Sequence, residues 1–168
     1  MSELNFDPRG WRESFKDEKN NLLYYLKDYQ VSITHIGATA YTGSRSNRNV
    51  DILLAVKSIV DLNSVLVRLQ SKKYKVIEQS PKADFYVLVG PSKVMGYGVT
   101  IRLMEYASFV FNRYQAFITL LKEDRSKVSA YNDFRAELVN KCGSNWAMYN
   151  ELKQNYIEAL IDENFKFE

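Results

Sequence analysis

The sequence predicts an α+β fold, in which a mixed sheet of about five strands is followed by a run of three helices. Two observations predict it. Five short β-branched or apolar runs suited to strands lie between about residues 31 and 106, and from about residue 108 to 164 the apolar residues keep a helical period. The 168 residues contain no internal repeat or linker, so one domain over residues 1–168 is expected.

The first third of the chain is expected to hold a helix, two strands and a second helix. Segment 11–29 is an amphipathic helix whose apolar stripe consists of Trp11, Phe15, Leu22, Leu23 and Leu26. The runs "VSITHIG" and "VDILLAV" are short enough to be strands. Ser58 is suited to cap a helix over 59–73, because its hydroxyl can accept a hydrogen bond from the first turn.

The remaining elements follow the same two patterns. The runs "YKVIEQ", "DFYVLVG" and "YGVTIRLM" predict three more strands, the last two joined through the turn-like segment "PSKVMG". Helices are expected at about 109–122, 126–142 and 145–164. Their breaks fall near Asp124 and at "CGSN", where Gly143 ends one helix and Ser144 caps the next.

Composition excludes several classes of function. The net charge of +3 is too small to indicate nucleic acid, and no apolar run is long enough to span a membrane. The N-terminus lacks a signal-peptide layout and Cys142 is the only cysteine, so a cytoplasmic protein is expected. His35 is the only histidine, which argues against a His-rich metal site. Neither a P-loop nor a dinucleotide-binding glycine fingerprint is present.

The stretch "HIGATAYTGSRSNRNVDILL" contains the most informative pattern. Gly37, Ala38 and Thr39 follow a strand and are placed to present backbone N–H groups to a phosphate. Asp51 is a lone carboxylate in an apolar strand, and burying it without a partner would be unfavourable. Two interpretations of Asp51 follow: it accepts hydrogen bonds from loop arginines or backbone, or it binds Mg²⁺ through oxygen.

This stretch resembles the GrpB family of the nucleotidyltransferase superfamily, whose members carry a pattern like "HVGSTAVPGLAAKPIIDI". Further resemblances follow in the family's order at "FDPRGWRESFKDEK", "TIRLMEYAS", "FITLLK", "YNDFRAEL" and "YNELKQNYI". The positions of the first motif kept without a gap are His35, Gly37, Thr39, Ala40, Gly43, Asp51 and Ile52.

The resemblance implies a nucleotidyltransferase-like fold and the transfer of a nucleoside monophosphate from a triphosphate to an acceptor. In the superfamily, carboxylates hold Mg²⁺ at the reacting phosphate. Asp51 is the residue expected to act in catalysis and bind the metal, and Gly37, Ala38 and Thr39 the residues expected to hold phosphate. The pattern is incomplete, because Ala38 replaces a serine and Leu53 stands where the second acid would be.

Basic residues are the other expected part of the site. Arg45 and Arg48 lie in the loop before Asp51, and Arg102 stands, like Thr100, where the family pattern "HLHVV" has a histidine. Arginine binds phosphate well without a metal, so these three are expected to bind the phosphate of a nucleotide. Alternation along "TIRLME" places Glu105 on the opposite face from Arg102, which makes Glu105 a poor second metal ligand.

Three hypotheses follow from the sequence. The protein is a nucleotidyltransferase with a degenerate metal site, or a non-catalytic module that binds a nucleotide or phosphorylated metabolite. The least favoured is an RNA- or protein-interaction domain using "SKKYK", whose lysines are also explained by the end of a helix. The substrate, the acceptor and the oligomeric state are left open.

Overall fold

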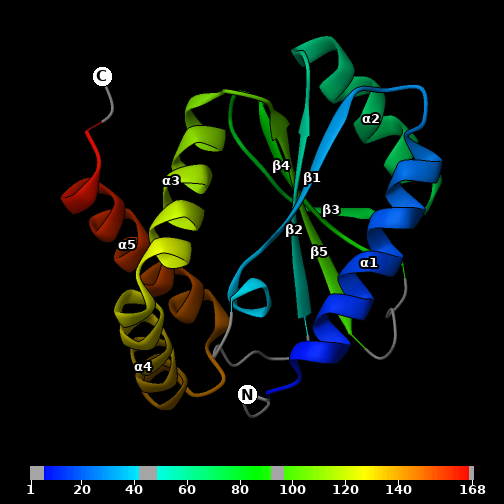
Figure 1. The fold of residues 1–168 in the computed structure, drawn as a ribbon. Helices are drawn as coiled ribbons and strands as arrows, with labels where there is room; N and C mark the ends of the chain where they lie inside the picture. Colours follow the sequence, from blue (N-terminus) through cyan, green and yellow to red (C-terminus); the bar gives the residue numbers. More distant parts are fainter. Residues whose placement is uncertain (1–5, 42–48, 92–96, 167–168) are drawn as a thin grey trace.

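Five strands form a mixed sheet in the computed structural model, which describes residues 6–41, 49–91 and 97–166. The sheet order is β1-β2-β5-β4-β3 (Figure 1). The strands are β1 (Val31–Ile36), β2 (Asn49–Val56), β3 (Lys75–Gln79), β4 (Phe85–Val89) and β5 (Gly98–Glu105). The predicted α+β class with a mixed sheet is confirmed.

The centre of the sheet sets the positions of the residues discussed below. β1 pairs antiparallel with β2, which places Ile36 opposite Asp51. β2 pairs parallel with β5, and in this register Asp51 lies beside Thr100 and Leu53 beside Arg102. The expected pairing of segment 31–36 with 49–56 is therefore present. β4 joins β5 and β3 by antiparallel pairing and completes the sheet.

Helices α1 (Pro8–Tyr25) and α2 (Ile59–Ser71) cover one face of the sheet (Figure 1). Ser58 caps α2 as predicted, since its hydroxyl accepts a hydrogen bond from the Asp61 N–H. The even-numbered residues of β2 alternate toward these helices and form the larger core with them. Its most deeply buried members include Trp11, Leu22, Ile52, Leu54, Leu62, Leu69 and Ile101.

Helices α3 (Phe109–Glu123), α4 (Arg125–Cys142) and α5 (Trp146–Asn164) lie on the other side of the sheet (Figure 1). α3 packs directly on it: Leu53 is buried in a cluster with Phe111 and Ile118. A second cluster joins the three helices to the short 3₁₀ turn η1 (Ala38–Ala40), because Tyr41 at its end packs among their apolar residues. The loop after β1 thus connects the sheet with the helical part.

Three local predictions were wrong. α1 begins at Pro8 instead of residue 11, because the Asp7 carboxylate accepts a hydrogen bond from the Gly10 N–H and caps the helix. Leu23 was expected on its buried stripe but is 45% exposed. At the last break, Gly143 ends α4 as expected, but Asn145, and not Ser144, caps α5 by accepting from the Met148 N–H.

None of the helices described is both long and apolar enough to cross a membrane.

Candidate functional site

The site begins where β1 ends at Gly37. Gly37 has φ +71°, a backbone conformation that other residues rarely adopt. It also lies against Asp51 on the neighbouring strand: a Cβ at Gly37 would be 2.8 Å from Asp51 Oδ2. Both the conformation and the contact require glycine, and they bring the start of the loop onto the carboxylate.

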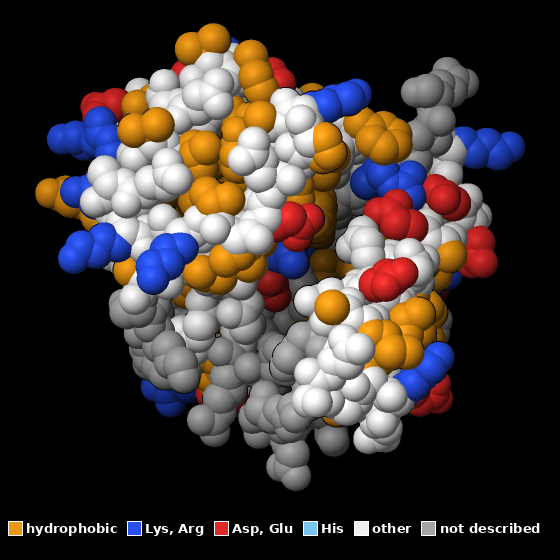
Figure 2. Space-filling view, turned by 180° about the vertical axis from the view of Figure 1, so that it is seen from behind, with side chains coloured by type: hydrophobic (Ala, Val, Ile, Leu, Met, Phe, Trp, Pro, Cys, Tyr) orange, Lys and Arg blue, Asp and Glu red, His pale blue; other side chains and the backbone are white. Residues whose placement is uncertain are grey.

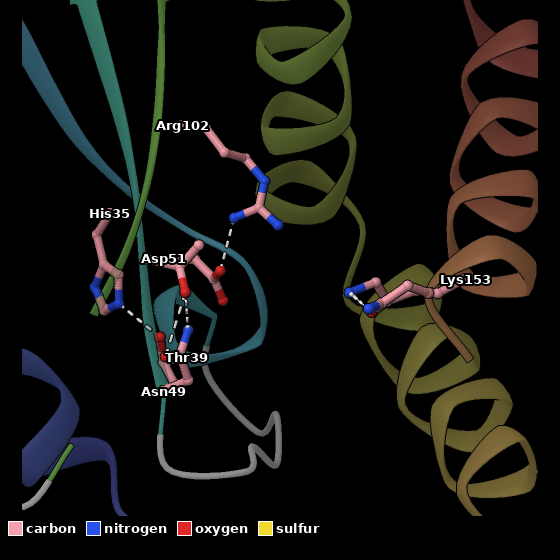
Figure 3. A network of polar contacts seen from close by, with 8 residues as sticks. His35, Thr39, Asn49, Asp51, Arg102 and Lys153 are labelled. Atoms are coloured by element: carbon pink, nitrogen blue, oxygen red, sulfur yellow. Dashed lines mark hydrogen bonds and ion pairs between the residues drawn. The ribbon is translucent and has the colours of Figure 1, made fainter. Parts of the chain in front are cut away.

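The other oxygen of Asp51 is held by Arg102. Arg102 Nη1 donates to Asp51 Oδ1 at 2.7 Å, and the two side chains are 21% and 24% exposed (Figure 3). Burial alone would lower the pKa of Arg102, but the Asp51 carboxylate and the Tyr114 hydroxyl on α3 raise it above its usual value. Arg102 therefore stays charged, and the pair remains within reach of a ligand.

The residues present do not fit a two-metal centre. Leu53, two residues after Asp51 on the same face, is 1% exposed and packs under α3. Glu105 lies beside Val56 in register, and Val56 belongs to the core on the α1 side, so Glu105 projects away from Asp51. In the described ranges, no group of three or more His, Cys, Asp or Glu residues is arranged to hold a metal ion.

Polar side chains next to Asp51 are held by one another. His35 Nε2 lies 2.7 Å from the Thr39 hydroxyl, which fixes the η1 turn on β1 (Figure 3). Asn49 Nδ2 donates to the Thr100 hydroxyl at 3.1 Å, which joins the start of β2 to β5. Burial lowers the pKa of His35 to about 4, against an opposing effect of Asp51. His35 is therefore neutral near pH 7 and acts as a hydrogen-bonding support.

The helical part contributes basic residues to the same region. Lys153 on α5 points toward the side of the molecule on which Asp51 and Arg102 lie (Figure 3). Burial lowers the pKa of Lys153 to about 8; Asp51 opposes this shift, and the positive charges of Arg102 and Arg135 add to it. Arg135 on α4 is 6% exposed. Figure 2 shows a groove between the sheet part and the helical part, with acidic and basic side chains visible inside it.

Each of these two helical cations is supported by a tyrosine one turn earlier. Arg135 lies over the ring of Tyr131, with its guanidinium carbon 5.7 Å from the ring centroid. Lys153 lies over the ring of Tyr149, with Nζ at 5.6 Å from the centroid. Such contacts stabilise a cation by roughly 0.5–2 kcal/mol. In both α4 and α5, a positive charge is therefore stabilised by the ring of a tyrosine four residues earlier.

The structure brings some of the predicted residues together. Gly37, Asp51 and Arg102 are in one site, and Thr39 lies beside them in η1, while Ala38 is buried in the same turn. The predicted residues Arg45 and Arg48 lie outside the described ranges.

Sequence reasoning missed Arg135, Lys153 and the role of His35 as a support for Thr39. A signal for the two cations is visible in retrospect: "YNDFR" and "YNELK" each place a basic residue four positions after a tyrosine, on one helical face. No such helical spacing identifies Thr39 as the partner of His35, because the two residues are brought together by the turn at the end of β1.

Comparisons with known proteins support the fold and the family. The structure is similar to the conserved protein GrpB from Enterococcus faecalis, with a TM-score of 0.76, 20% identity and 92% of each chain covered. It is also similar to a chain of the GLD-2/RNP-8 complex, with a TM-score of 0.53, 14% identity, 84% of this chain covered and 49% of that chain. Identities this low support the nucleotidyltransferase-like fold alone. A search of the curated proteins found no match. The family described as GrpB protein matches residues 4–163, and this chain belongs to the GrpB family.

Proposed function

We propose that the protein binds a phosphorylated ligand, either a nucleotide or a phosphorylated metabolite, in the groove between the sheet and helices α4 and α5. One observation carries the proposal. Lys153 on α5 lies within electrostatic reach of Arg102 on β5, Arg135 on α4 and the Asp51 carboxylate on β2. Cations that lie close together favour an anionic ligand, and arginine binds phosphate with strong, directed hydrogen bonds.

The glycine loop supports the same ligand. The Thr39 hydroxyl is engaged with His35, and the φ of Gly37 turns the chain sharply between β1 and η1. Backbone N–H groups at such a turn are suitable donors for a phosphate oxygen. The loop lies against Asp51 and thus on the same side as Arg102. We propose that loop amides and basic side chains bind the phosphate together.

Binding is measured most directly by isothermal titration calorimetry with the four common ribonucleoside triphosphates and monophosphates. Lys153→Met keeps the length and apolar body of the side chain and removes its charge. Since a charge-assisted hydrogen bond contributes roughly 1.5–3 kcal/mol, this variant should weaken binding about tenfold or more. Lys141→Met, at an exposed position on α4, is the matched control and should leave affinity unchanged. Equal affinities for both variants and the wild type would contradict the proposed site.

Nucleotidyl transfer is the second candidate function. The observation that favours it is the position of Asp51, directly beside the glycine loop on the next strand, as the resemblance to the superfamily implies. The residues around Asp51 do not fit two metal ions, which argues for ligand binding without turnover. A labelled triphosphate assay with Mg²⁺ separates the two: turnover that Asp51→Asn abolishes would establish the transferase, whereas binding without turnover supports the module.

A further inference from the structure

We propose that Arg102 takes the place that a divalent cation would occupy at Asp51, so that the groove selects a metal-free phosphomonoester over a magnesium-bound triphosphate. This inference rests on the proposed function, because it specifies which phosphorylated ligand the groove takes. It also makes a separate statement about the site itself, namely that Arg102 keeps divalent cations away from Asp51.

The first step is the engagement of the Asp51 carboxylate. Oδ1 accepts from Arg102 Nη1 at 2.7 Å, and Oδ2 lies against Gly37 so closely that no Cβ fits there. A Mg²⁺ ion needs six oxygen ligands close to an octahedron. To use Oδ1, the ion would have to displace a charged guanidinium, and on the side of Oδ2 it meets the backbone at Gly37. A cation is already present at this carboxylate.

The second step is the lack of other oxygen ligands on this face of the sheet. The position that the superfamily pattern gives to a second acid is Leu53, which is buried against α3. The next polar side chains, Asn49 and Thr100, are neutral and bonded to each other. Neutral oxygens bind Mg²⁺ weakly without several carboxylates or phosphates. In the part of the chain that is described, Asp51 alone would hold a divalent cation only weakly, so the positive charge of Arg102 decides whether one binds there.

The third step concerns the form of the ligand. A guanidinium has five N–H donors, and its fork matches two oxygens of a phosphate. Arg102 donates from Nη1 to Asp51 and also bonds the Tyr114 hydroxyl, so these two contacts use part of its five N–H donors. A triphosphate in Mg²⁺ solution brings its own cation, which would come close to Arg102 and Lys153. Like charges repel, so the metal-bound form loses affinity relative to the free form.

A phosphomonoester can bind without bringing a metal cation close to these basic side chains. It carries close to two negative charges near neutral pH. It has one phosphoryl group and lacks the adjacent phosphates with which a triphosphate chelates Mg²⁺. Arg102 and Lys153 place two cations near Asp51, and the described residues include no ligand set for a metal, which matches such an anion better than a magnesium complex. The ion pair with Asp51 also orients the Arg102 side chain before the ligand arrives, which reduces the entropy lost on binding.

The first experiment compares ligand forms by calorimetry on the full chain. AMP, CMP, GMP and UMP, and the corresponding triphosphates, are titrated once with EDTA and once with excess Mg²⁺. We expect the tightest monophosphate to bind equally in both conditions, and its triphosphate to bind several-fold more weakly with Mg²⁺ than with EDTA. A triphosphate that binds more tightly with Mg²⁺ would overturn the inference and leave the proposed binding function intact.

The second experiment tests the role of Arg102 without any nucleotide. Mn²⁺ binding is followed by electron paramagnetic resonance, because bound Mn²⁺ loses the signal of the free ion. Arg102→Gln and Arg102→His, the latter with the residue of the family pattern, should each bind Mn²⁺ at least about tenfold more tightly than the wild type. Adding Asp51→Asn to either variant should remove the gain. Both variants are prepared because the test needs only one that folds. Circular dichroism shows which of them is folded.

The outcomes separate the two proposals. If no nucleotide binds in either condition, the proposed function fails, and the Mn²⁺ measurement still decides whether Arg102 blocks cations at Asp51. If the wild type binds Mn²⁺ as tightly as the Arg102 variants, in an Asp51-dependent way, the inference fails whatever the nucleotides do.

Discussion

The imidazole of His35 stacks on the ring of Phe15 with the two planes at 9° and the ring centroids 4.6 Å apart. Phe15 belongs to α1 and His35 to β1, so the contact fastens the first helix to the strand that leads into the glycine loop. The Nε2 atom at the edge of the same imidazole ring is hydrogen-bonded to the Thr39 hydroxyl. A single histidine thus joins α1, β1 and the loop.

A first prediction concerns this histidine and pH. Burial lowers its pKa to about 4, below the value near 6.5 expected in the unfolded chain. Between these two values the unfolded state binds the proton and the folded state does not, so the free energy of unfolding should fall as pH decreases from 6.5 to 4. Because the shift spans more than two pH units, the loss should be of the order of 1–3 kcal/mol.

The measurement is straightforward because His35 is the only histidine in the chain. Its Cε1–H resonance can be followed by NMR against pH without assignment, and urea unfolding can be repeated across the same range. His35→Gln should show a smaller loss of stability between pH 6.5 and 4.5. A resonance that titrates near pH 6.5 in the folded protein would contradict the prediction.

A second prediction concerns the contact between Gly37 and Asp51. Gly37→Ala introduces a positive-φ alanine, which costs about 1–2 kcal/mol, and also a Cβ 2.8 Å from Asp51 Oδ2. The matched control is Gly143→Ala, since Gly143 has φ +55° and no atom within 4 Å of the added Cβ. Urea unfolding should show a larger loss for Gly37→Ala than for Gly143→Ala. Equal losses of unfolding free energy would contradict the prediction, because they would mean that the Asp51 carboxylate moves away from the added Cβ without cost.

A third prediction uses Asp51 to distinguish an anion site from a metal site. If basic side chains hold the ligand, Asp51→Asn removes a negative charge beside Arg102 and should raise the affinity for nucleoside monophosphates, by about three- to tenfold. A site that depends on a metal bound to Asp51 would instead lose affinity. Calorimetry in EDTA measures the change, and Asp17→Asn, at an exposed position on α1, is the control.

A fourth prediction concerns the pH dependence of ligand binding. Burial lowers the pKa of Lys153 to about 8, so its ammonium loses the proton as pH rises through 8, well before an ordinary lysine. A phosphomonoester is fully ionised over this range, and its affinity should fall between pH 7 and 9. Lys153→Met should bind more weakly at pH 7 and show a flat profile up to pH 9. A wild-type affinity that is also constant between pH 7 and 9 would show that Lys153 does not contact the ligand.

The sequence predicted the fold well because its signals are local. The five strands and five helices follow from short β-branched runs and from apolar residues at helical spacing, and these patterns survive in the structure. Two of the three errors fell at helix ends. Asp7 and Asn145 were missed as caps because several polar residues precede each helix, and the hydrogen bond that selects one of them is not a matter of composition.

The site was predicted only in part, because its main contacts join distant segments. Gly37 and Asp51 lie in one short stretch of the sequence, so one motif contains both. Arg102 was expected near the phosphate, but its bond to Asp51 depends on β2 and β5 being neighbours in the sheet. A helix and two strands intervene between them in the chain, and strand order cannot be derived from periodicity. The contribution of α4 and α5 required the packing of the helices around the groove.

The packing of Leu53 limits which substitutions could add a second metal ligand to the site. A two-metal centre on this scaffold would need an acid at residue 53, and the side chain at that position is packed beside Phe111 and Ile118. Introducing a carboxylate there would bury a charge without a partner, which destabilises a fold by several kcal/mol. Such an acid would therefore require α3 to pack differently before it could act as a metal ligand. The leucine at position 53 thus ties the chemistry of this face of the sheet to the packing of α3.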